Sequence, residues 1–273
     1  MTVNNLSAPA TTRKVLELLD DLEAPGMRVC DVGAGFGYFS QLLGERLAER
    51  GLDPREHLSA CDMVPSTFAW DGIECAPIRA DGTLPFEGGT FDVTISIEVV
   101  EHTEDPFFFL RELARITKPG GTVIVTTPNV LNMNSRLRTL VWGFPVLFDP
   151  LPLADQDIRY LDGHIHPITP YFLAYAALQA GLYHPRFHAD RAKRSASVWA
   201  TLLCPLLWLG HRSNVARLRR KRPALLQQNR SIIDAQNSWR LLTSRTTILV
   251  ATRSETPVRP RGPGSVPGPS ERR

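Results

Sequence analysis

Hydrophobic and polar positions follow two different periods along the first 130 residues. Helical spacing, with apolar residues three and four apart, occurs at residues 10–23 and 36–50. A third helix is expected to begin at Asp105-Pro106 and to end at the Lys-Pro-Gly-Gly run of residues 118–121. Short apolar runs typical of buried strands lie between the helical segments, at residues 28–32, 57–62, 73–78, 91–97 and 122–127. Strands that alternate with helices predict an α/β fold with a parallel sheet covered on both faces.

The second half of the chain is less regular. Residues 130–170 predict a long, partly helical connection, followed by a helix at 169–181 and a strand at 182–188. We expect the core to cover residues 1–190. The rest divides into an insertion, a last core strand and a Pro-, Gly-, Ser- and Arg-rich disordered tail, at residues 191–243, 244–253 and 254–273.

The strongest local signal is a glycine-rich turn between the first strand and the following helix. Asp31 is followed by Gly33, Gly35 and Gly37 at every second position. Glycine lets the backbone pass close to a ligand in conformations that a Cβ forbids. A dinucleotide fingerprint needs its third glycine at position 38, where Tyr38 stands, so NAD is disfavoured. The carboxylate of Asp31 suits a ligand with an ammonium group and would repel a pyrophosphate.

Carboxylates also follow the second and third strands. Asp62 closes the second strand, where it could accept both hydroxyls of a ribose, and Asp81 follows the third, where it could accept from an exocyclic amine. Either residue alone could be a solvated loop acid. Together with Asp31 they place three acids at the carboxyl ends of successive strands. These ends converge on the crevice where open α/β sheets bind ligands, which favours a site.

These motifs resemble class I S-adenosylmethionine (SAM)-dependent methyltransferases, in the broad group that includes ubiquinone-biosynthesis O-methyltransferases. The resemblance covers about residues 25–130. It rests on Asp31-x-Gly33-x-Gly35-x-Gly37, Asp62, Ala80-Asp81, Leu84-Pro85-Phe86, Phe91-Asp92-Val93, Glu101-His102 and residues 113–121. It implies a Rossmann-like, seven-stranded sheet that is mostly parallel, with an antiparallel last strand at residues 245–253. It also implies a SAM site in which the three glycines of the loop and Asp31 lie against the methionine moiety, Asp62 binds the ribose and Asp81 the adenine.

A second cluster follows the fourth strand, on the side expected to face the methyl acceptor. If residues 98–102 begin a helical turn, Glu98, Glu101 and His102 lie three and four apart on one face. Such a group could ligate Mg²⁺, Mn²⁺ or Zn²⁺. Similar Glu-x-x-Glu-His motifs bind metal in some ubiquinone-type O-methyltransferases and in small-RNA 2′-O-methyltransferases. The latter add a downstream histidine, for which this chain offers His164 or His166, and we assign His166.

Two other interpretations of this cluster stay open. His102 could act with Glu101 as a metal-free general base, or the pair could be structural. Residues 163–170 resemble a connection that borders the acceptor pocket in similar methyltransferases. His164 and His166 lie there in an extended segment, and we expect only one of them to face the site.

Charge is distributed unevenly along the chain. Residues 1–190 hold 14 Lys/Arg and 25 Asp/Glu, whereas residues 191–273 hold 17 and 3, which together give the net charge of +3. Inside the basic part, the apolar run 196–210 carries Trp199 and Trp208 but also Pro205, and it is too short to span a bilayer. We expect residues 191–222 to form helices on an anionic membrane surface, the alternative being a lid or dimer helix. A nucleic-acid partner is not expected, because no RNA-binding module signature is present.

Cysteine usage and the N-terminal segment bear on compartment. Cys30, Cys61, Cys75 and Cys204 form no C-x-x-C pair, and the first thirty residues contain no apolar signal segment. We therefore expect a cytoplasmic protein, peripheral on the inner membrane face.

These observations predict a SAM-dependent methyltransferase that methylates an oxygen of a small or lipid-linked acceptor. Short similarities to methyltransferases of cell-surface glycan synthesis, at residues 127–131 and 164–167, add a glycan to the quinone-like acceptors considered. A hydroxyl acceptor must lose its proton, which calls for a general base or a metal. The alternatives are a metal-dependent RNA 2′-O-methyltransferase and a SAM-binding scaffold without catalysis. The glycine loop together with Glu98, Glu101 and His102 argues against the scaffold.

Overall fold

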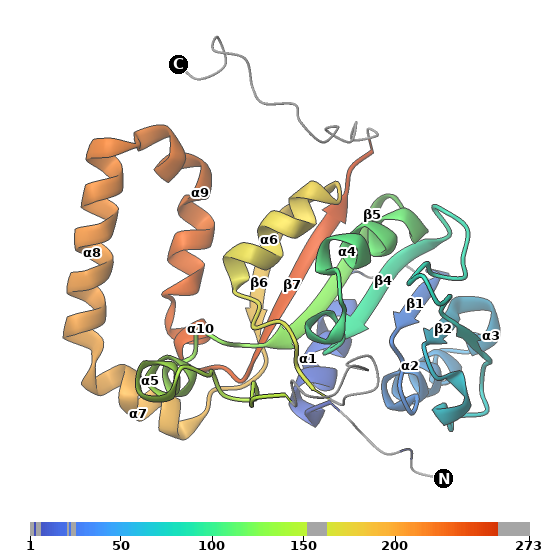
Figure 1. The fold of residues 1–273 in the computed structure, drawn as a ribbon. Coiled ribbons are helices and arrows are strands. Elements are labelled where there is room, and N and C mark those ends of the chain that lie inside the picture. The colour runs from blue at the N-terminus through green and yellow to red at the C-terminus, as the bar shows by residue number, and fades with distance from the viewer. Residues whose placement is uncertain (1–2, 4–6, 21, 23–25, 152–162, 256–273) are drawn as a thin grey trace.

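One mixed sheet organises the fold (Figure 1). The computed structural model describes residues 3, 7–20, 22, 26–151 and 163–255. Within these residues the strand order is β3-β2-β1-β4-β5-β7-β6. The strands are β1 Val29–Val32, β2 Leu58–Asp62, β3 Cys75–Pro77, β4 Phe91–Ile97, β5 Thr117–Pro128, β6 Leu182–Ala189 and β7 Thr246–Arg253.

Strand directions confirm the predicted topology. β1 pairs in parallel with β2 and β4, β2 with β3, and β4 with β5. β7, the last strand in the chain, lies between β5 and β6 and is antiparallel to both. The carboxyl ends of the parallel strands therefore meet at one edge of the sheet, which is where open α/β sheets form ligand crevices.

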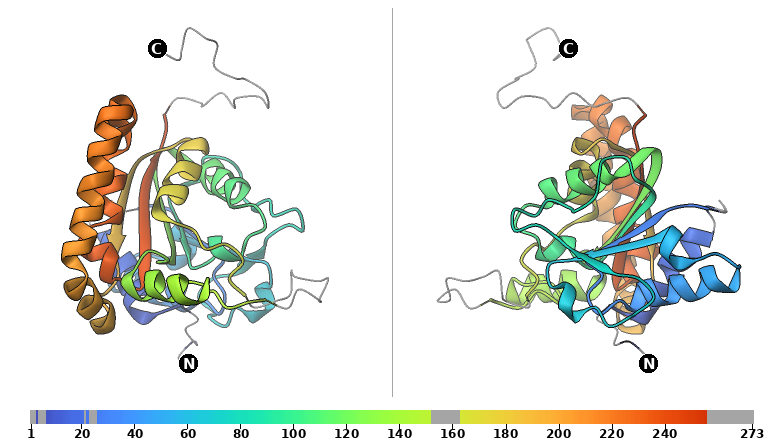
Figure 2. Two further views of the ribbon diagram at one scale, coloured as in Figure 1. Left: turned by 60° about the vertical axis from the view of Figure 1, so that its left-hand side comes forward. Right: turned by 90° about the vertical axis from the view of Figure 1, so that its right-hand side faces the viewer.

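Helices cover both faces of the sheet (Figure 2). On one face, α1 (Pro9–Asp20) and α2 (Tyr38–Glu49) bury their apolar stripes against β1, β2 and β4. On the other, α4 (Pro106–Ile116) and α6 (Pro170–Gln179) form the larger core cluster. Removal of these apolar side chains from water is the main force that holds the layers together.

The predicted start of the third helix is confirmed, and its predicted end differs. Asp105 caps α4, since its carboxylate accepts from the amides of Phe107 and Phe108, both at 2.9 Å. Thr169 likewise caps α6. Residues 118–121, expected to end a helix before a strand at 122–127, already belong to β5, which begins as soon as α4 ends.

Four further helices lie between β6 and β7. They are α7 Arg194–Leu202, α8 Cys204–Lys221, α9 Pro223–Gln236 and α10 Trp239–Thr243. α8 and α9 run antiparallel and project beyond the β6 edge of the sheet, and we call this pair the arm (Figure 1). α5 (Met133–Trp142) packs against α7 at the base of the arm. α3 (Pro54–His57) is a single turn before β2.

The predicted tail, residues 254–273, lies outside the described residues apart from 254 and 255. Within the described part of the chain, every helix is either too short or too polar to cross a lipid bilayer.

Candidate functional site

The loop between β1 and α2 places its three glycines in the left-handed backbone region. The φ angles of Gly33, Gly35 and Gly37 are 77°, 53° and 88°. Position 33 is the most restrictive, because a Cβ there would lie 2.4 Å from Cγ2 of Val99. The Gly33 amide donates to the Cys61 carbonyl at 2.8 Å. The glycine loop, the end of β2 and the segment after β4 therefore meet at one edge of the sheet.

Asp31 lies beneath this loop and is almost fully buried. Its Oδ2 accepts a hydrogen bond of 2.6 Å from the Ser40 hydroxyl, which joins β1 to α2. Burial raises the pKa of Asp31 to about 7, the Ser40 hydrogen bond opposes this rise, and the negative charge of Asp62 adds to it. A cation bound in the crevice would favour the ionised carboxylate, as expected for an acid facing an ammonium or sulfonium group.

Asp62 links two backbone segments of the crevice. Its Oδ2 accepts from the Gly35 amide and its Oδ1 from the Val64 amide, both at 2.8 Å. Beside it, the apolar side chains of Met63 and Val64 are 60% and 53% exposed. An acid with further lone pairs next to exposed apolar side chains offers both hydrogen bonds and a stacking surface to a nucleoside. No sequence motif marked these two neighbours.

Asp81 occupies an exposed turn after β3. Its Oδ1 accepts from the Thr83 amide at 2.9 Å, and hydrogen bonds from Thr83 hold the pKa of Asp81 below its ordinary value. The Ile78 amide donates to the Asp62 carbonyl at 2.9 Å, which attaches the start of this turn to β2. Asp81 thus stays ionised on the same edge of the sheet as Asp62.

Glu98 has a partner that the sequence did not indicate. Its backbone takes a φ of 54°, and its side chain forms an ion pair of 2.5 Å with Arg245. The Thr246 hydroxyl donates to the same Glu98 oxygen at 3.2 Å. The predicted helical turn begins only at Val100, as a short 3₁₀ segment, η2 (Val100–His102). Glu98 therefore faces the start of β7 instead of sharing a face with Glu101 and His102.

Glu101 is completely buried, and among the described residues neither of its carboxyl oxygens has a hydrogen-bond partner. Burial raises the pKa of Glu101 to about 8, and its own backbone amide opposes this rise. The charge of Glu98 adds to the rise, and the nearby Thr127 hydroxyl and Arg245 lower the pKa by smaller amounts. A buried carboxyl with no partner is costly unless it faces a ligand or a proton donor. This group is the clearest sign of function on the acceptor side.

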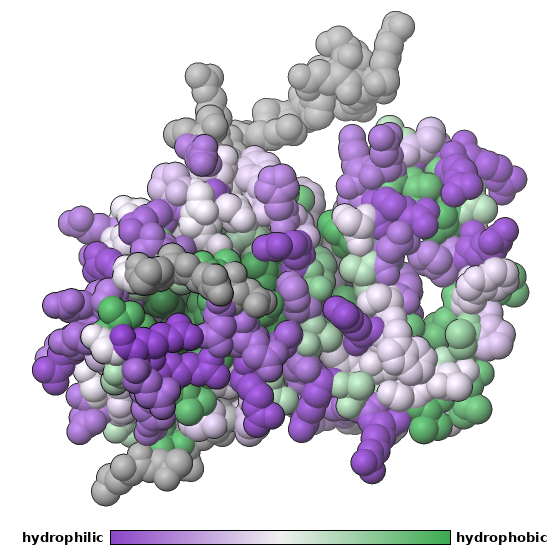
Figure 3. Space-filling model, turned by 180° about the vertical axis from the view of Figure 1, so that it is seen from behind, coloured by the Kyte–Doolittle hydropathy of each residue, from purple (hydrophilic) through white to green (hydrophobic). Residues whose placement is uncertain are grey.

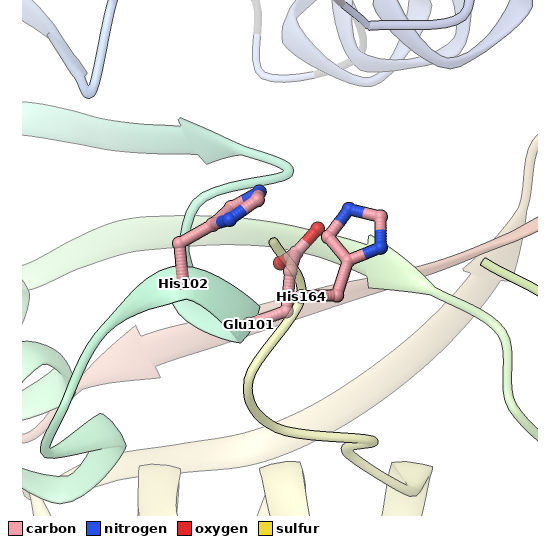
Figure 4. A group of neighbouring side chains, drawn as sticks. All are labelled: Glu101, His102 and His164. Carbon is pink, nitrogen blue, oxygen red and sulfur yellow. The ribbon is translucent and has the colours of Figure 1, made fainter. Parts of the chain in front are cut away.

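Two histidines lie beside Glu101 (Figure 4). Glu101, His102 and His164 each offer a ligating atom, and these atoms all lie within 4.8 Å of one another. The His102 Nδ1 lies 2.9 Å from the Gly163 carbonyl, and the His164 Nδ1 lies 2.5 Å from the Leu147 carbonyl. Because a carbonyl can only accept, both Nδ1 atoms carry a proton in these contacts.

His164, not His166, joins the group. The Glu101 carbonyl accepts from the amides of both Ile165 and His166, which docks this extended segment on η2. The His166 side chain points elsewhere, with its Nε2 3.4 Å from the Glu104 carbonyl. The predicted ligand set of Glu98, Glu101, His102 and His166 thus differs from the assembled group of Glu101, His102 and His164.

Sequence reasoning also missed the residues that support this group. The Leu147 carbonyl and the Phe148 ring, whose centroid lies 5.1 Å from that of His164, both belong to the irregular connection after α5. Arg245 lies 147 residues from Glu98 in the chain. No local motif announces such contacts. The only available signal was the pair of histidines in an extended segment.

Comparisons with known proteins agree with this architecture. Residues 30–125 match a family model described as a methyltransferase domain. The chain is 32% identical over 160 residues to a ubiquinone biosynthesis O-methyltransferase of Ralstonia nicotianae, covering 58% of this chain and 63% of the relative. It is 33% identical over 105 residues to the protein of that name from Rhizobium johnstonii, covering 38% and 42%. A solved SAM-dependent methyltransferase from Archaeoglobus fulgidus shares the fold, with a TM-score of 0.53 and 13% identity over 89% of this chain and 92% of that chain.

Residues 30–125, which contain the glycine loop, Asp62 and Asp81, are therefore similar to a methyltransferase domain, in agreement with the resemblance to class I SAM-dependent methyltransferases. Both curated relatives reported above are named ubiquinone biosynthesis O-methyltransferases, and the chain spans 42% and 63% of their lengths.

Proposed function

We propose that this protein transfers the methyl group of SAM to an oxygen atom of a small or lipid-linked acceptor, glycan or quinone-like. The observation that carries the proposal is the buried Glu101 carboxyl, which has no hydrogen-bond partner among the described residues and lies beside two histidines, directly after the segment that touches the glycine loop. Val99 contacts the position of Gly33 and Glu101 follows two residues later. The cofactor crevice and the proton-accepting group are therefore neighbours.

Methyl transfer to oxygen is an in-line displacement in which a C–O bond forms and the C–S⁺ bond of SAM breaks. Most of the acceleration comes from holding the two reactants in line. The acceptor hydroxyl must give up its proton, and we assign that proton to Nε2 of His102. The Gly163 carbonyl fixes the tautomer that this role requires. The positive imidazolium that results would favour ionisation of the buried Glu101 next to it.

Acceptor methylation in the presence of radiolabelled SAM tests the proposal. Soluble catechols represent the quinone-like class, and short-chain polyprenyl-linked sugars represent the glycan class. Transfer of label to oxygen of either acceptor, as located by mass spectrometry, is the expected result. Tight SAM binding with no transfer to any hydroxyl acceptor, and transfer to an amine or carbon acceptor instead, would contradict O-methylation.

Binding of SAM is expected to strengthen as the pH rises from 6 to 8. The pKa of Asp31 is raised to about 7, and a sulfonium and ammonium ligand favours the carboxylate. Below pH 7 the carboxyl must therefore lose its proton on binding. The dissociation constant should fall by up to about tenfold per pH unit there and become constant above pH 8. Calorimetry in two buffers of different ionisation enthalpy measures the released proton.

The matched variant for this pH dependence is Asp31→Asn, which keeps a carbonyl oxygen to accept the hydrogen bond from Ser40. It should bind SAM more weakly and with no dependence on pH over this range. A pH dependence that persists unchanged in Asp31→Asn would assign the proton to a different group.

Metal-assisted methyl transfer is a second candidate, favoured by the fit of the residues to a divalent cation. One buried carboxylate and two imidazoles, whose ligating atoms lie within 4.8 Å of one another, form a credible ligand set, and the two imidazoles favour a transition-metal ion such as Mn²⁺ or Zn²⁺ over Mg²⁺. Such an ion would lower the pKa of an acceptor hydroxyl. Glu101, His102 and His164 would hold it, in place of the set predicted with Glu98 and His166.

Removal of metal tests this second candidate. Protein dialysed against a chelator is titrated with Mn²⁺ alone, followed by calorimetry or electron paramagnetic resonance. If an ion is held by this group, His164→Ala should abolish the Mn²⁺ isotherm while His166→Ala retains it. Loss in His166→Ala with retention in His164→Ala would restore the ligand set predicted from sequence. Full transferase activity in chelator leaves His102 as a metal-free base.

A further inference from the structure

The arm presents one side of α8 that no described part of the chain covers. The inner side of α8 consists of Leu207, His211, Val215 and Leu218, which are buried or half-buried and recur every three or four residues. This side packs on α9, and His211 lies 3.5 Å from Asp234 of that helix. α9 in turn contacts α6. The opposite side of α8 forms the outer margin of the molecule (Figure 1).

Apolar side chains line this outer side from α7 into the first half of α8. Their exposed fractions lie between 44% and 65%, and we call them the outer apolar face: Val198, Trp199, Leu202, Leu206, Trp208 and Leu209. Positions 198, 202, 206 and 209 are spaced as one helical stripe across the α7–α8 junction. Ala196 and Ala200, on the opposite side of α7, are buried in a small core with Met133 and Leu242. The exposed stripe is therefore separate from the side of α7 that packs in that small core.

Basic residues continue along α8 where the apolar ones end. Residues 191–222 contain nine Lys/Arg and no Asp/Glu. The Arg212 guanidinium lies 5.3 Å from the ring centroid of Trp208. The second half of α8 and its end carry the exposed Arg217, Arg219, Arg220, Lys221 and Arg222. Seen from behind, hydrophobic surface lies at the lower end of the arm, with hydrophilic side chains around its upper end (Figure 3).

We propose that α7 and α8 dock this protein on the surface of an anionic phospholipid bilayer. The outer apolar face would enter the level of the headgroups, and the basic half of α8 would lie over lipid phosphates. Tryptophans beside leucines and arginines are suited to that boundary, where one end of the side chain is apolar and the other is wet. The proposal is independent of which acceptor is methylated.

The length of α8 indicates how the arm would lie on the bilayer. The 18 residues of α8 extend about 27 Å, whereas screening limits attraction between exposed charges to roughly 10 Å at physiological salt. An arm inserted end-on by its apolar half would hold the basic cluster too far from lipid to contribute. With α8 flat on the surface, both halves make contact at once. The helix would thus lie along the membrane surface and would not cross it, in agreement with the short apolar run at residues 196–210.

A second copy of the chain is a less suitable occupant of this surface. A two-fold contact between two such faces would bring the two basic segments together, and neither offers an acid in residues 191–222 to neutralise them. An anionic bilayer offers an apolar acyl-chain region and negatively charged headgroups together. α5 packs on α7 through a hydrogen bond of 2.8 Å between Asn134 and Ser195, and its own Leu140 and Val141 are exposed.

Flotation of the full chain with vesicles tests the proposal. Vesicles of phosphatidylcholine with one third phosphatidylglycerol should carry the protein, and those of phosphatidylcholine alone should carry much less. The double variant Leu206→Ser/Leu209→Ser should bind at least about 100-fold more weakly, because two buried apolar contacts are lost. Leu225→Ser, an exposed leucine of α9 outside the stripe, is the matched control and should bind as the unchanged protein does.

Charge is tested with a second matched pair. Arg217, Arg219 and Arg220 changed together to Gln should weaken binding to anionic vesicles about 100-fold and reduce its salt dependence. The same change at Arg13, Arg55 and Arg111, which are exposed on the core, alters net charge equally and should have little effect. Equal losses from the two triple variants would show that bulk charge and not the arm is responsible, which overturns the proposal.

Two further results would also overturn it. Failure of the unchanged protein to float with anionic vesicles, together with a dimer in ultracentrifugation that Leu206→Ser/Leu209→Ser dissociates, would assign the face to a second copy. Quenching of tryptophan fluorescence by brominated lipid checks the contact directly. It should be lost when Trp199 and Trp208 are both changed to Phe, and quenching that survives this change would place the bilayer on another surface.

Discussion

Replacing Gly35 by valine should abolish SAM binding in a protein that still folds. Gly35 has a φ of 53°, and its amide donates to Asp62 at 2.8 Å. A β-branched residue at positive φ is a steric outlier, so the loop would move and the orientation of Asp62 would be lost with it. The branched side chain would also fill the space next to the backbone that the ligand needs. We expect at least about 100-fold weaker binding of SAM, which corresponds to roughly 3 kcal/mol.

Gly51→Val provides the matched control. Gly51 has a φ of 75°, and no heavy atom lies within 4 Å of an added Cβ, so this change introduces comparable backbone strain far from the crevice. Calorimetry with SAM and thermal unfolding of both variants separate the effects. Both melting temperatures should fall by similar amounts, whereas only Gly35→Val should lose the ligand. Unchanged affinity in a folded Gly35→Val protein would show that the cofactor lies elsewhere.

The cofactor half of the site could be predicted because its information is local. Gly33, Gly35 and Gly37 are close in sequence, and each is needed where the backbone reverses at the end of a buried strand. Asp62 ends β2 at the predicted position, and parallel pairing of β2 with β1 brings it to Gly35 without further specification. The strand pattern in the sequence predicts both where the glycine loop lies and which strand ends lie next to it.

The acceptor half depends on contacts between distant segments. The sequence predicted that Glu98 shares a helical face with Glu101. In the structure Glu98 is drawn to Arg245 at the start of β7, and a positive φ directs its side chain there. A tertiary ion pair has therefore overridden local helical spacing. Nothing between residues 98 and 102 could reveal a partner on the last strand.

The sequence failed to select between His164 and His166 for a different reason. Regular alternation would place residues 164 and 166 on the same side of an extended segment, so it could not choose between them, and the direction of each side chain depends on what the segment pairs with. Here the Glu101 carbonyl accepts from the amides of Ile165 and His166, and this docking directs His164 inward. Which histidine faces Glu101 can be determined only when the turn after β4 and the connection before α6 are seen together.

Changing His102 to alanine should leave SAM binding intact and reduce turnover by about 10²- to 10⁴-fold, the usual contribution of a general base. The His102 imidazole lies beside Glu101 and His164 and is not part of the glycine loop. Its loss should therefore lower kcat without weakening SAM binding. Glu101→Gln should act similarly, because it removes the charge that would accompany a protonated imidazole. Single-turnover methylation together with SAM calorimetry measures both quantities.

His166→Ala is the decisive control, because His166 was the histidine predicted from sequence to join the site. The structure places its Nε2 near the Glu104 carbonyl, so this variant should retain nearly full kcat. If His166→Ala lost as much activity as His102→Ala, His166 and not His164 would have to face the acceptor in the working enzyme. If His102→Ala lost SAM binding while folded, the imidazole would belong to the cofactor side of the crevice.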